Sequence, residues 1–278
     1  MLSWEGAVVW FRSQPENQQV TRDAFYDDPL IDAAERYRNS SEWLEVRRLL
    51  HGRTGSALDV GAGRGIATYA LTRDGFTVTA LEPDPSAIVG ASAIRKLGED
   101  ANLKINIVET FSERLPFADG SFDVVFARAV LHHMKDLAGA CREICRVLKP
   151  GGIFIAAREH VISRDADLKT FLAQHPLHRY YGGEQAFRLN TYKDALNSAG
   201  FSPLEILDPL SSPINLFPYT FDGLRDAIIE RLSQKLPLPG WRTLLASDRV
   251  FGWVLFVAGY FDRRPGRLYS FIGYKALH

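Results

Sequence analysis

The chain has 278 residues, and its 33 Lys and Arg residues are balanced by 33 Asp and Glu residues. This balance excludes the strongly basic field by which proteins hold nucleic acids through their phosphates, so we expect no DNA or RNA partner. A hydrophobic content of 46% and a charged content of 24% are those of an ordinary globular protein.

Residues 1–12 carry Trp4, Glu5, Trp10 and Arg12 among their apolar side chains, unlike the uninterrupted apolar core of a signal peptide. No run in the sequence reaches the roughly 18 to 20 apolar residues needed to span a bilayer. We therefore expect a cytoplasmic protein, and leave a peripheral membrane contact open.

The segment before residue 54 is expected to be mainly helical after Pro15, because apolar residues recur there at helical spacing. The run Asp27-Asp28-Pro29 should start one of these helices, with the proline in its first turn. Tyr26 and Tyr37 are either ligand contacts or ordinary core and surface aromatics, the commoner role.

Three glycines, Gly61, Gly63 and Gly65, join a buried strand expected at 56–60 to a helix expected at 66–72. Glycine enters positive φ without penalty and lets a ligand approach the backbone, while the amides that open a helix are unpaired donors. The spacing GxGxG differs from the GxGxxG of dinucleotide folds, because Ile66 stands where the third glycine would be. The segment therefore predicts a nucleotide-binding turn, with an ordinary tight turn as the alternative.

Glu82 follows the second expected strand, at 76–81, on the same edge of the sheet as this turn. In an open α/β sheet, an acidic residue at that position accepts hydrogen bonds from ribose hydroxyls. Two independent features thus indicate one crevice.

From Gly55 onward strands and helices alternate, which predicts a parallel, doubly wound α/β sheet. Further strands are expected at 103–108, 122–127, 153–157, 204–207 and 269–275, with helices at 137–148 and 192–199. Pro150-Gly151-Gly152 should end the first of these helices. Two insertions depart from a minimal core, at about 158–191 and 208–268, and the second is too long to lack helices of its own.

Cys141 and Cys145 lie on the apolar side of the helix expected at 137–148. Two cysteines at this spacing are better read as small core residues than as a metal or redox pair. A reducing compartment is the expected setting.

With these residues the chain resembles the class I S-adenosylmethionine-dependent methyltransferases of small molecules, with a core of the methyltransferase-11 type. The segment 58–65 looks like the first motif of that family, and Leu81-Glu82-Pro83-Asp84 looks like the second. Later blocks match at 115–123, 130–133 and 148–152.

The resemblance implies a Rossmann-like sheet of seven strands in the order 3-2-1-4-5-7-6, with the last strand antiparallel. It also implies a helical N-terminal lid at 1–53 and a cofactor-binding domain at 54–278. The insertions at 158–191 and 208–268 would form helical caps on that domain.

The same resemblance suggests how S-adenosylmethionine would be bound. Gly61, Gly63 and Gly65 would let the backbone approach its methionine and ribose parts, and Glu82 would hold the ribose diol. Asp59 would orient the turn or the amino group indirectly.

The adenine would lie near Pro83 and the turn at Ser112 and Glu113, and Arg128 would lie near the methionine end. Relatives commonly place an acidic residue where this chain has Phe111. A carboxylate contact to the adenine amino group is therefore not expected, and Phe111 either stacks on the ring or packs elsewhere.

Histidines supply the candidate general bases, since histidine titrates near neutrality. His160 leaves the fifth strand at the edge where substrate meets cofactor, and His133 follows the fourth strand. For the neighbouring His132, a structural role in the pocket wall is favoured. His160, His175 and His178 could converge on a metal, but their spacing matches no recognised signature, so no metal is predicted.

Residues 250–261 are nearly all apolar or aromatic, and Arg263, Arg264 and Arg267 follow them. The segment 250–267 could rest on a membrane or receive a lipid-linked substrate. A helix buried against the core, or a contact in a homodimer, is the plainer alternative.

The expected function is transfer of a methyl group from S-adenosylmethionine to a small-molecule or lipid-linked acceptor, at oxygen, by direct displacement. Nitrogen and carbon acceptors stay open. The alternatives are a non-catalytic sensor or scaffold that binds S-adenosylmethionine, and an NAD-dependent oxidoreductase, against which the GxGxG spacing counts.

Overall fold

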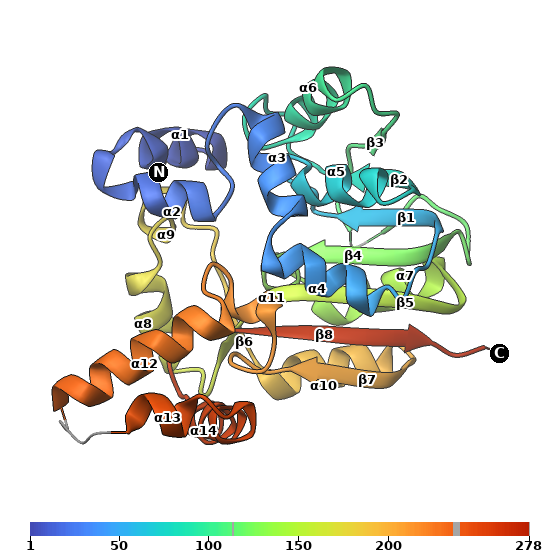
Figure 1. The fold of residues 1–278 in the computed structure, drawn as a ribbon. Helices are drawn as coiled ribbons and strands as arrows, with labels where there is room; N and C mark the ends of the chain where they lie inside the picture. Colours follow the sequence, from blue (N-terminus) through green and yellow to red (C-terminus); the bar gives the residue numbers. More distant parts are fainter. Residues whose placement is uncertain (113, 236–239, 278) are drawn as a thin grey trace.

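The structure, a computed structural model, describes residues 1–112, 114–235 and 240–277, and the strands of that part form one sheet (Figure 1). The strands are β1 (Gly55–Val60), β2 (Phe76–Leu81), β3 (Asn106–Val108), β4 (Phe122–Arg128), β5 (Leu148–Ile162), β6 (Phe187–Arg188), β7 (Phe201–Leu207) and β8 (Arg267–Lys275). Their order is β3-β2-β1-β4-β5-β8-β7, and β6 pairs with the end of β5.

The pairing of β8 is antiparallel to both β5 and β7, whereas β1 to β5 run parallel to one another. This confirms the expected order and its antiparallel last strand, with β7 and β8 as the sixth and seventh strands. The two-residue β6 is an addition that the sequence did not predict.

Helices cover both faces of the sheet and bury its apolar side chains. The helices that follow the strands are α5 (Ile66–Arg73), α6 (Ala91–Asp100), α7 (Leu137–Val147) and α10 (Leu189–Ser198). One core cluster joins the sheet to α7 and α10, and another joins it to α5 and the N-terminal helices. Cys141 and Cys145 are buried free thiols of α7, which confirms them as core residues.

The N-terminal segment contains α1 (Trp4–Ser13), the 3-10 helix η1 (Pro15–Asn17), α2 (Gln18–Asp23), α3 (Leu30–Arg38) and α4 (Ser41–Leu49). α3 begins at Leu30, so a helix does start at the predicted place, but Pro29 is its extended N-cap residue and not part of its first turn. Tyr37 is fully buried. The parallel strands run toward α1 and α2, so these two helices lie beyond the carboxyl ends of the strands (Figure 1).

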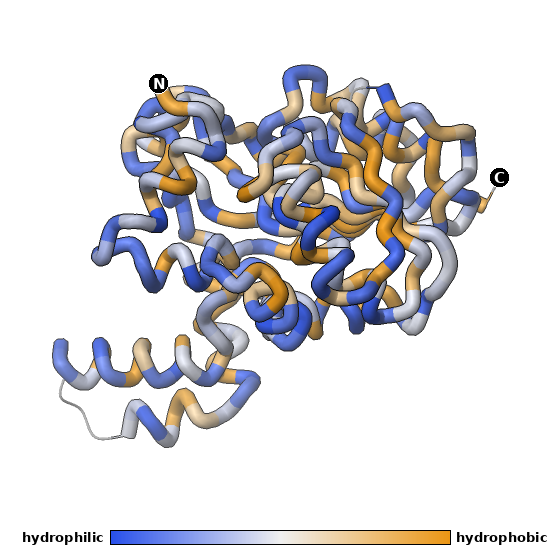
Figure 2. Tube along the Cα trace, turned by 90° about the horizontal axis from the view of Figure 1, so that it is seen from above, coloured by the Kyte–Doolittle hydropathy of each residue, from blue (hydrophilic) through white to orange (hydrophobic). Residues whose placement is uncertain are grey.

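Both insertions are helical. The first holds α8 (Asp167–Gln174) and α9 (His178–Tyr181), and the second holds α11 (Pro213–Leu216), α12 (Phe221–Lys235), α13 (Trp241–Leu245) and α14 (Asp248–Phe261). The hairpin of α12 and α13 extends away from the body of the molecule (Figures 1 and 2). None of the helices in the described ranges is long and apolar enough to cross a membrane.

β5 differs most from its prediction, which placed the strand at 153–157. It begins at Leu148, so Pro150-Gly151-Gly152 lies within its bounds, and it continues to Ile162. The pairing of β5 with β8 shifts between Ala156 and Glu159, where Arg158 has a φ of 62°. The expected end at Ala157 is therefore wrong, because a bulge carries the strand through Arg158, Glu159 and His160.

Candidate active site

The glycine turn, Gly61 to Gly65, links β1 to α5 with positive φ at Gly61 (63°), Gly63 (55°) and Gly65 (84°). At Gly61 a Cβ atom would lie 2.7 Å from the Val130 side chain, so the turn packs against the segment that follows β4. At Gly63 the nearest heavy atom to such a Cβ would be the Val89 carbonyl oxygen, 3.9 Å away. The backbone of Gly63 is therefore open to a ligand.

Glu82 lies beside this opening at the end of β2. Its carboxylate accepts hydrogen bonds from the amides of Gly63, at 2.7 Å, and Asp84, at 2.9 Å. Burial raises the pKa of Glu82 to about 7, against the effect of these two hydrogen bonds. A buried carboxylate next to a glycine whose backbone is open to a ligand fits a ribose diol, as the cofactor of the resemblance requires.

Asp59 supports the turn from below. It is buried, and its carboxylate accepts a hydrogen bond from the Thr68 hydroxyl of α5 at 2.6 Å. Burial raises the pKa of Asp59 to about 7. An orienting role is consistent with this contact, and a direct contact with a ligand stays a prediction.

The expected adenine contacts are less defined. Pro83 and Ser112 are half-buried, and the Phe111 side chain is 70% exposed, so it does not pack into the core. Glu113, which the sequence placed in the same turn, lies outside the described residues.

Arg128 forms an ion pair that the sequence did not predict. Its guanidinium donates to the buried Glu42 of α4 through Nε, at 2.6 Å, and a second nitrogen, at 2.9 Å. Arg158 approaches the same carboxylate at 3.8 Å. Burial works against the charge on Glu42, but Arg128 and Arg158 outweigh it and lower the pKa of the carboxyl. Arg128 thus fastens α4 to β4, and any contact with the cofactor would have to coexist with this ion pair.

Glu159 organises the segment that follows β4. Its buried carboxylate accepts hydrogen bonds from the amides of Val130, Leu131 and His132, at 3.0, 3.1 and 3.1 Å. The same carboxylate lies 2.7 Å from Nδ1 of His132, which is 1% exposed. The bulge in β5 aims Glu159 at this segment, which is a common use of bulges beside functional sites.

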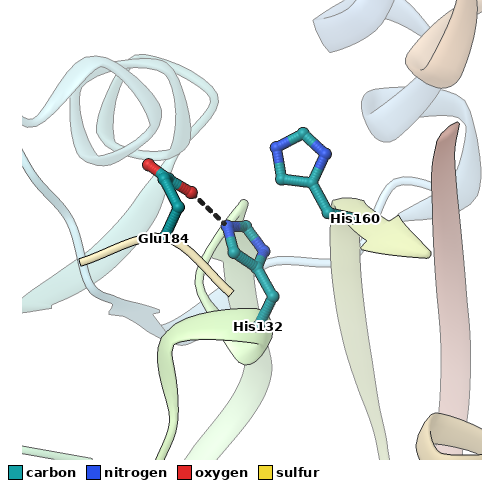
Figure 3. A group of neighbouring side chains, drawn as sticks. All are labelled: His132, His160 and Glu184. Carbon is teal, nitrogen blue, oxygen red and sulfur yellow. Dashed lines mark ion pairs between the residues drawn. The ribbon is translucent and has the colours of Figure 1, made fainter. Parts of the chain in front are cut away.

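Glu184, between α9 and β6, lies opposite His132 (Figure 3). One of its oxygens is 3.7 Å from Nε2 of His132 and 3.8 Å from Nε2 of His133. Its other oxygen accepts a hydrogen bond from the Tyr181 hydroxyl and lies 3.8 Å from Nδ1 of His175. A single buried carboxylate is therefore surrounded by three imidazoles and a phenol.

His160 completes the group, which we call the histidine cluster (His132, His133, His160, His175 and Glu184). Its ring centroid lies 4.7 Å from that of His132 and 5.7 Å from that of His175. Nδ1 of His160 donates to the Gly266 carbonyl at 2.9 Å, and Nδ1 of His133 donates to that of Gly183 at 3.1 Å.

The charges in the cluster are strongly coupled. Burial disfavours a charged His132, but Glu159 and then Glu184 outweigh it and raise the pKa of its imidazole to about 9. Burial, together with the positive charge of His132, lowers the pKa of His160 to about 3. Burial also works against the charge on Glu184, yet the neighbouring histidines lower the pKa of that carboxyl.

The N-terminal helices and the first insertion pack against each other beside this region. Trp4 of α1 packs against Tyr26 and Tyr181, with ring centroids 6.1 and 4.7 Å apart. The Leu2 amide donates to the Tyr180 carbonyl at 2.8 Å. Because Val130 touches the glycine turn and Glu159 holds the same segment, the turn and the histidine cluster are neighbours.

The sequence located His160 and His133, and the structure brings both to the cluster, but it did not single out Glu159 or Glu184. A charged triplet, Arg158-Glu159-His160, was visible directly after an apolar strand. The bulge that keeps these residues in the strand, and the burial of Glu159, left no signal in the sequence. Glu184 comes close only because a distant insertion folds back.

Residues 58–156 match a family described as a methyltransferase domain. The ubiquinone biosynthesis O-methyltransferase of Methylobacterium nodulans is 38% identical over 103 residues, which cover 37% of this chain and 40% of the relative. A thiol S-methyltransferase of Homo sapiens is 32% identical over 165 residues, covering 58% of this chain and 65% of the relative.

Among solved structures, the phosphoethanolamine N-methyltransferase 2 of Haemonchus contortus, in complex with S-adenosyl-L-methionine, has a TM-score of 0.52 and 22% identity. The match covers 84% of this chain and 52% of the Haemonchus contortus chain, and at this identity it shows a similar fold only. The chain spans 40% of the length of the first curated relative, so the similarity lies in the cofactor-binding core.

Proposed function

Since the chain contains a class I S-adenosylmethionine-dependent methyltransferase domain, we propose that it methylates an oxygen atom of a small-molecule or lipid-linked acceptor by direct displacement. One observation supports this proposal above the others. The Gly63 backbone is open to a ligand, the Glu82 carboxylate lies beside it, and the histidine cluster is their neighbour. The named relatives methylate at oxygen and at sulfur, so the acceptor atom is our inference.

S-adenosylmethionine would supply an activated methyl group on a positively charged sulfur. The glycine turn would hold its backbone-facing side, and Glu82 would accept hydrogen bonds from the ribose hydroxyls. Displacement needs the nucleophile, the methyl carbon and the sulfur on one line, so the protein contributes mainly by positioning and by excluding water. No covalent protein nucleophile is needed.

An alcohol or phenol acceptor loses its proton as the new O–C bond forms and the S–C bond breaks. His160 and His133 are the candidates to take that proton. In both rings Nδ1 donates to a backbone carbonyl, which leaves Nε2 as the proton-accepting atom. His160 is the first candidate by position, because it lies on β5 at the edge where the cofactor would bind, but its pKa of about 3 makes it a weak base. His133, whose side chain is 38% exposed, is the second candidate.

A lipid-linked acceptor is suggested by α14. The sequence favoured a helix buried against the core or a dimer contact. In the structure, only Phe251 and Leu255 of α14 are buried, so the helix is not buried against the core. Trp253, Phe256, Tyr260 and Phe261 are each at least 65% exposed.

Exposed aromatic residues with cationic ends are typical of helices that lie in a membrane interface. On one stripe of α14 and its end, Arg249, Trp253, Phe256, Tyr260 and Arg263 are all exposed. We propose that α14 rests on a lipid surface and brings the site to its acceptor, and a homodimer contact is the alternative.

Two experiments test the proposed reaction. Calorimetry should give binding of S-adenosylmethionine and S-adenosylhomocysteine, and no binding of NAD. A panel of phenols, hydroquinones, thiols and amines with a labelled methyl donor should then show transfer to oxygen. Binding of the methyl donor without transfer to any acceptor would instead favour a sensor or scaffold.

A further inference from the structure

We propose that His132, His160 and Glu184 form a binding site for a divalent transition-metal ion. Each residue offers one ligand atom, and these atoms lie within 4.8 Å of one another (Figure 3). The residues come from the segment after β4, from β5 and from the loop before β6, so no short motif joins them.

The two imidazoles are held in the orientation that metal ligation needs. Nδ1 of His132 faces the Glu159 carboxylate at 2.7 Å, and Nδ1 of His160 faces the Gly266 carbonyl at 2.9 Å. An acceptor at Nδ1 keeps the proton on that nitrogen and turns Nε2 into the coordinating atom. Ligating histidines almost always have such a carboxylate or carbonyl behind them.

Glu184 supplies the second observation. Its residue is 8% exposed, and its Oε2 is buried without a hydrogen-bond partner. That same oxygen lies 3.7 Å from Nε2 of His132. A buried carboxylate oxygen with imidazoles at 3.7 and 3.8 Å but no hydrogen bond is poorly satisfied, and an ion between Glu184 and the imidazoles of His132 and His160 would satisfy it.

The electrostatics of the site also favour a cation. Two buried carboxylates, Glu159 and Glu184, flank His132 on opposite sides. With a neutral His132 they would leave two negative charges in the site, and a divalent ion would balance them.

Ligand type and spacing limit the choice of ion. Two imidazoles and one carboxylate suit zinc, iron or cobalt better than magnesium or calcium, which prefer oxygen ligands. Metal–ligand bonds of roughly 2.0–2.2 Å put ligand atoms about 3.3 Å apart in a tetrahedral site. Oε2 of Glu184 and Nε2 of His132 are 3.7 Å apart, and all three ligand atoms lie within 4.8 Å, so side-chain rotations would have to bring them closer.

Three protein ligands leave coordination positions open, as in catalytic rather than structural sites. If the proposed methylation of oxygen holds, the ion would bind the acceptor oxygen and favour loss of its proton. Nε2 of His160 would then ligate the ion, so His133 and not His160 would take that proton. This role rests on the proposed function, whereas binding of the ion does not.

The site is tested on the full chain after treatment with a chelator. Titration with Zn²⁺ in a calorimeter should give one ion per chain and raise the Tm of the protein. Co²⁺ should give a visible ligand-field absorption, whose intensity distinguishes four- or five-coordinate binding from the six-coordinate aqueous ion. Absence of stoichiometric binding of both ions would overturn the proposal.

Variants locate the ion. Glu184→Gln and His160→Gln, both nearly isosteric, should each weaken Zn²⁺ binding by at least about tenfold. His51→Gln, at an exposed histidine, should leave it unchanged. If both cluster variants bound Zn²⁺ with wild-type affinity, the ion would lie elsewhere. If a variant does not fold, the Co²⁺ spectrum of the wild-type protein decides whether the chain binds an ion.

A parallel titration with S-adenosylmethionine separates the two proposals. A chain that binds Zn²⁺ through the cluster but not S-adenosylmethionine retains the metal site and loses the proposed function. The reverse result overturns the metal site alone.

Discussion

Glu82 accepts a hydrogen bond from the amide of Gly63 at 2.7 Å, so the end of β2 is tied to the most open point of the glycine turn. The carboxylate therefore holds the turn, and in our proposal it also receives the ribose. Glu82→Gln keeps the size of the side chain but loses the charge, and we expect it to weaken S-adenosylmethionine binding by about tenfold or more.

The same residue predicts a pH dependence. Because burial raises the pKa of Glu82 to about 7, its carboxyl gains charge between about pH 6 and 8. The charged form is the better acceptor for ribose hydroxyls, so affinity for S-adenosylmethionine should rise as the pH rises through this window. Calorimetry at several pH values checks this, and an equally steep dependence in Glu82→Gln would assign it to another group.

Gly61 and Gly63 should respond differently to substitution by alanine. In Gly61→Ala the new Cβ would lie 2.7 Å from Val130, so we expect a loss of about 1–3 kcal/mol in the free energy of unfolding, besides the strain of positive φ. In Gly63→Ala the space is open, and only that strain, about 1 kcal/mol, should appear.

Cofactor binding separates the two glycines further. Gly63→Ala should stay folded yet lose S-adenosylmethionine, because the methyl group fills the space of the ligand. Denaturant unfolding and calorimetry on both variants provide the comparison. Full affinity in Gly63→Ala would mean that the cofactor does not approach this backbone.

The buried pair of Glu42 and Arg128 predicts an asymmetric loss of stability. Glu42→Gln leaves the half-buried Arg128 and Arg158 without their carboxylate, and removing one partner of a buried pair costs about 3–5 kcal/mol. Arg128→Met should cost less, because Arg158 still approaches Glu42 at 3.8 Å.

Unfolding in denaturant measures both variants, with Asp100→Asn in the exposed pair of Lys96 and Asp100 as the control. The control should leave stability almost unchanged. If Arg128→Met proved as costly as Glu42→Gln, Arg158 would not be a partner of this carboxylate.

His160→Gln should cut turnover by at least about tenfold to a hundredfold while the affinity for S-adenosylmethionine stays the same. The reason is that His160 lies in the cluster and not on the glycine turn. Steady-state kinetics and calorimetry together check this, and unchanged turnover would remove His160 from the reaction. Metal content, measured on the same samples, distinguishes loss of a ligand from loss of a base.

The sequence predicted the features that depend on a local, recurring pattern of residues. Alternating apolar runs predicted the sheet, and the resemblance supplied its strand order, because local pattern and glycine spacing determine these features. The bulge at Arg158 was not predictable in this way, since it depends on pairing with β8, which lies more than a hundred residues later. Glu184 and Glu42 owe their roles to contacts between distant segments.

The exposed aromatic stripe of α14 yields the last prediction. Burying Trp253 and Phe256 in a lipid interface removes apolar surface from water, and Arg249 and Arg263 at the two ends can approach anionic headgroups. The protein should therefore float with vesicles of phosphatidylglycerol and phosphatidylcholine, and less with phosphatidylcholine alone. Trp253→Ser with Phe256→Ser should reduce the bound fraction by about tenfold or more.

The control is the double variant Val20→Ser with Leu44→Ser, which removes exposed apolar side chains elsewhere and should not reduce the bound fraction. Equal flotation of both double variants would argue against α14 as the contact, and sedimentation of a dimer that the α14 variant abolishes would assign the stripe to a second copy of the chain instead.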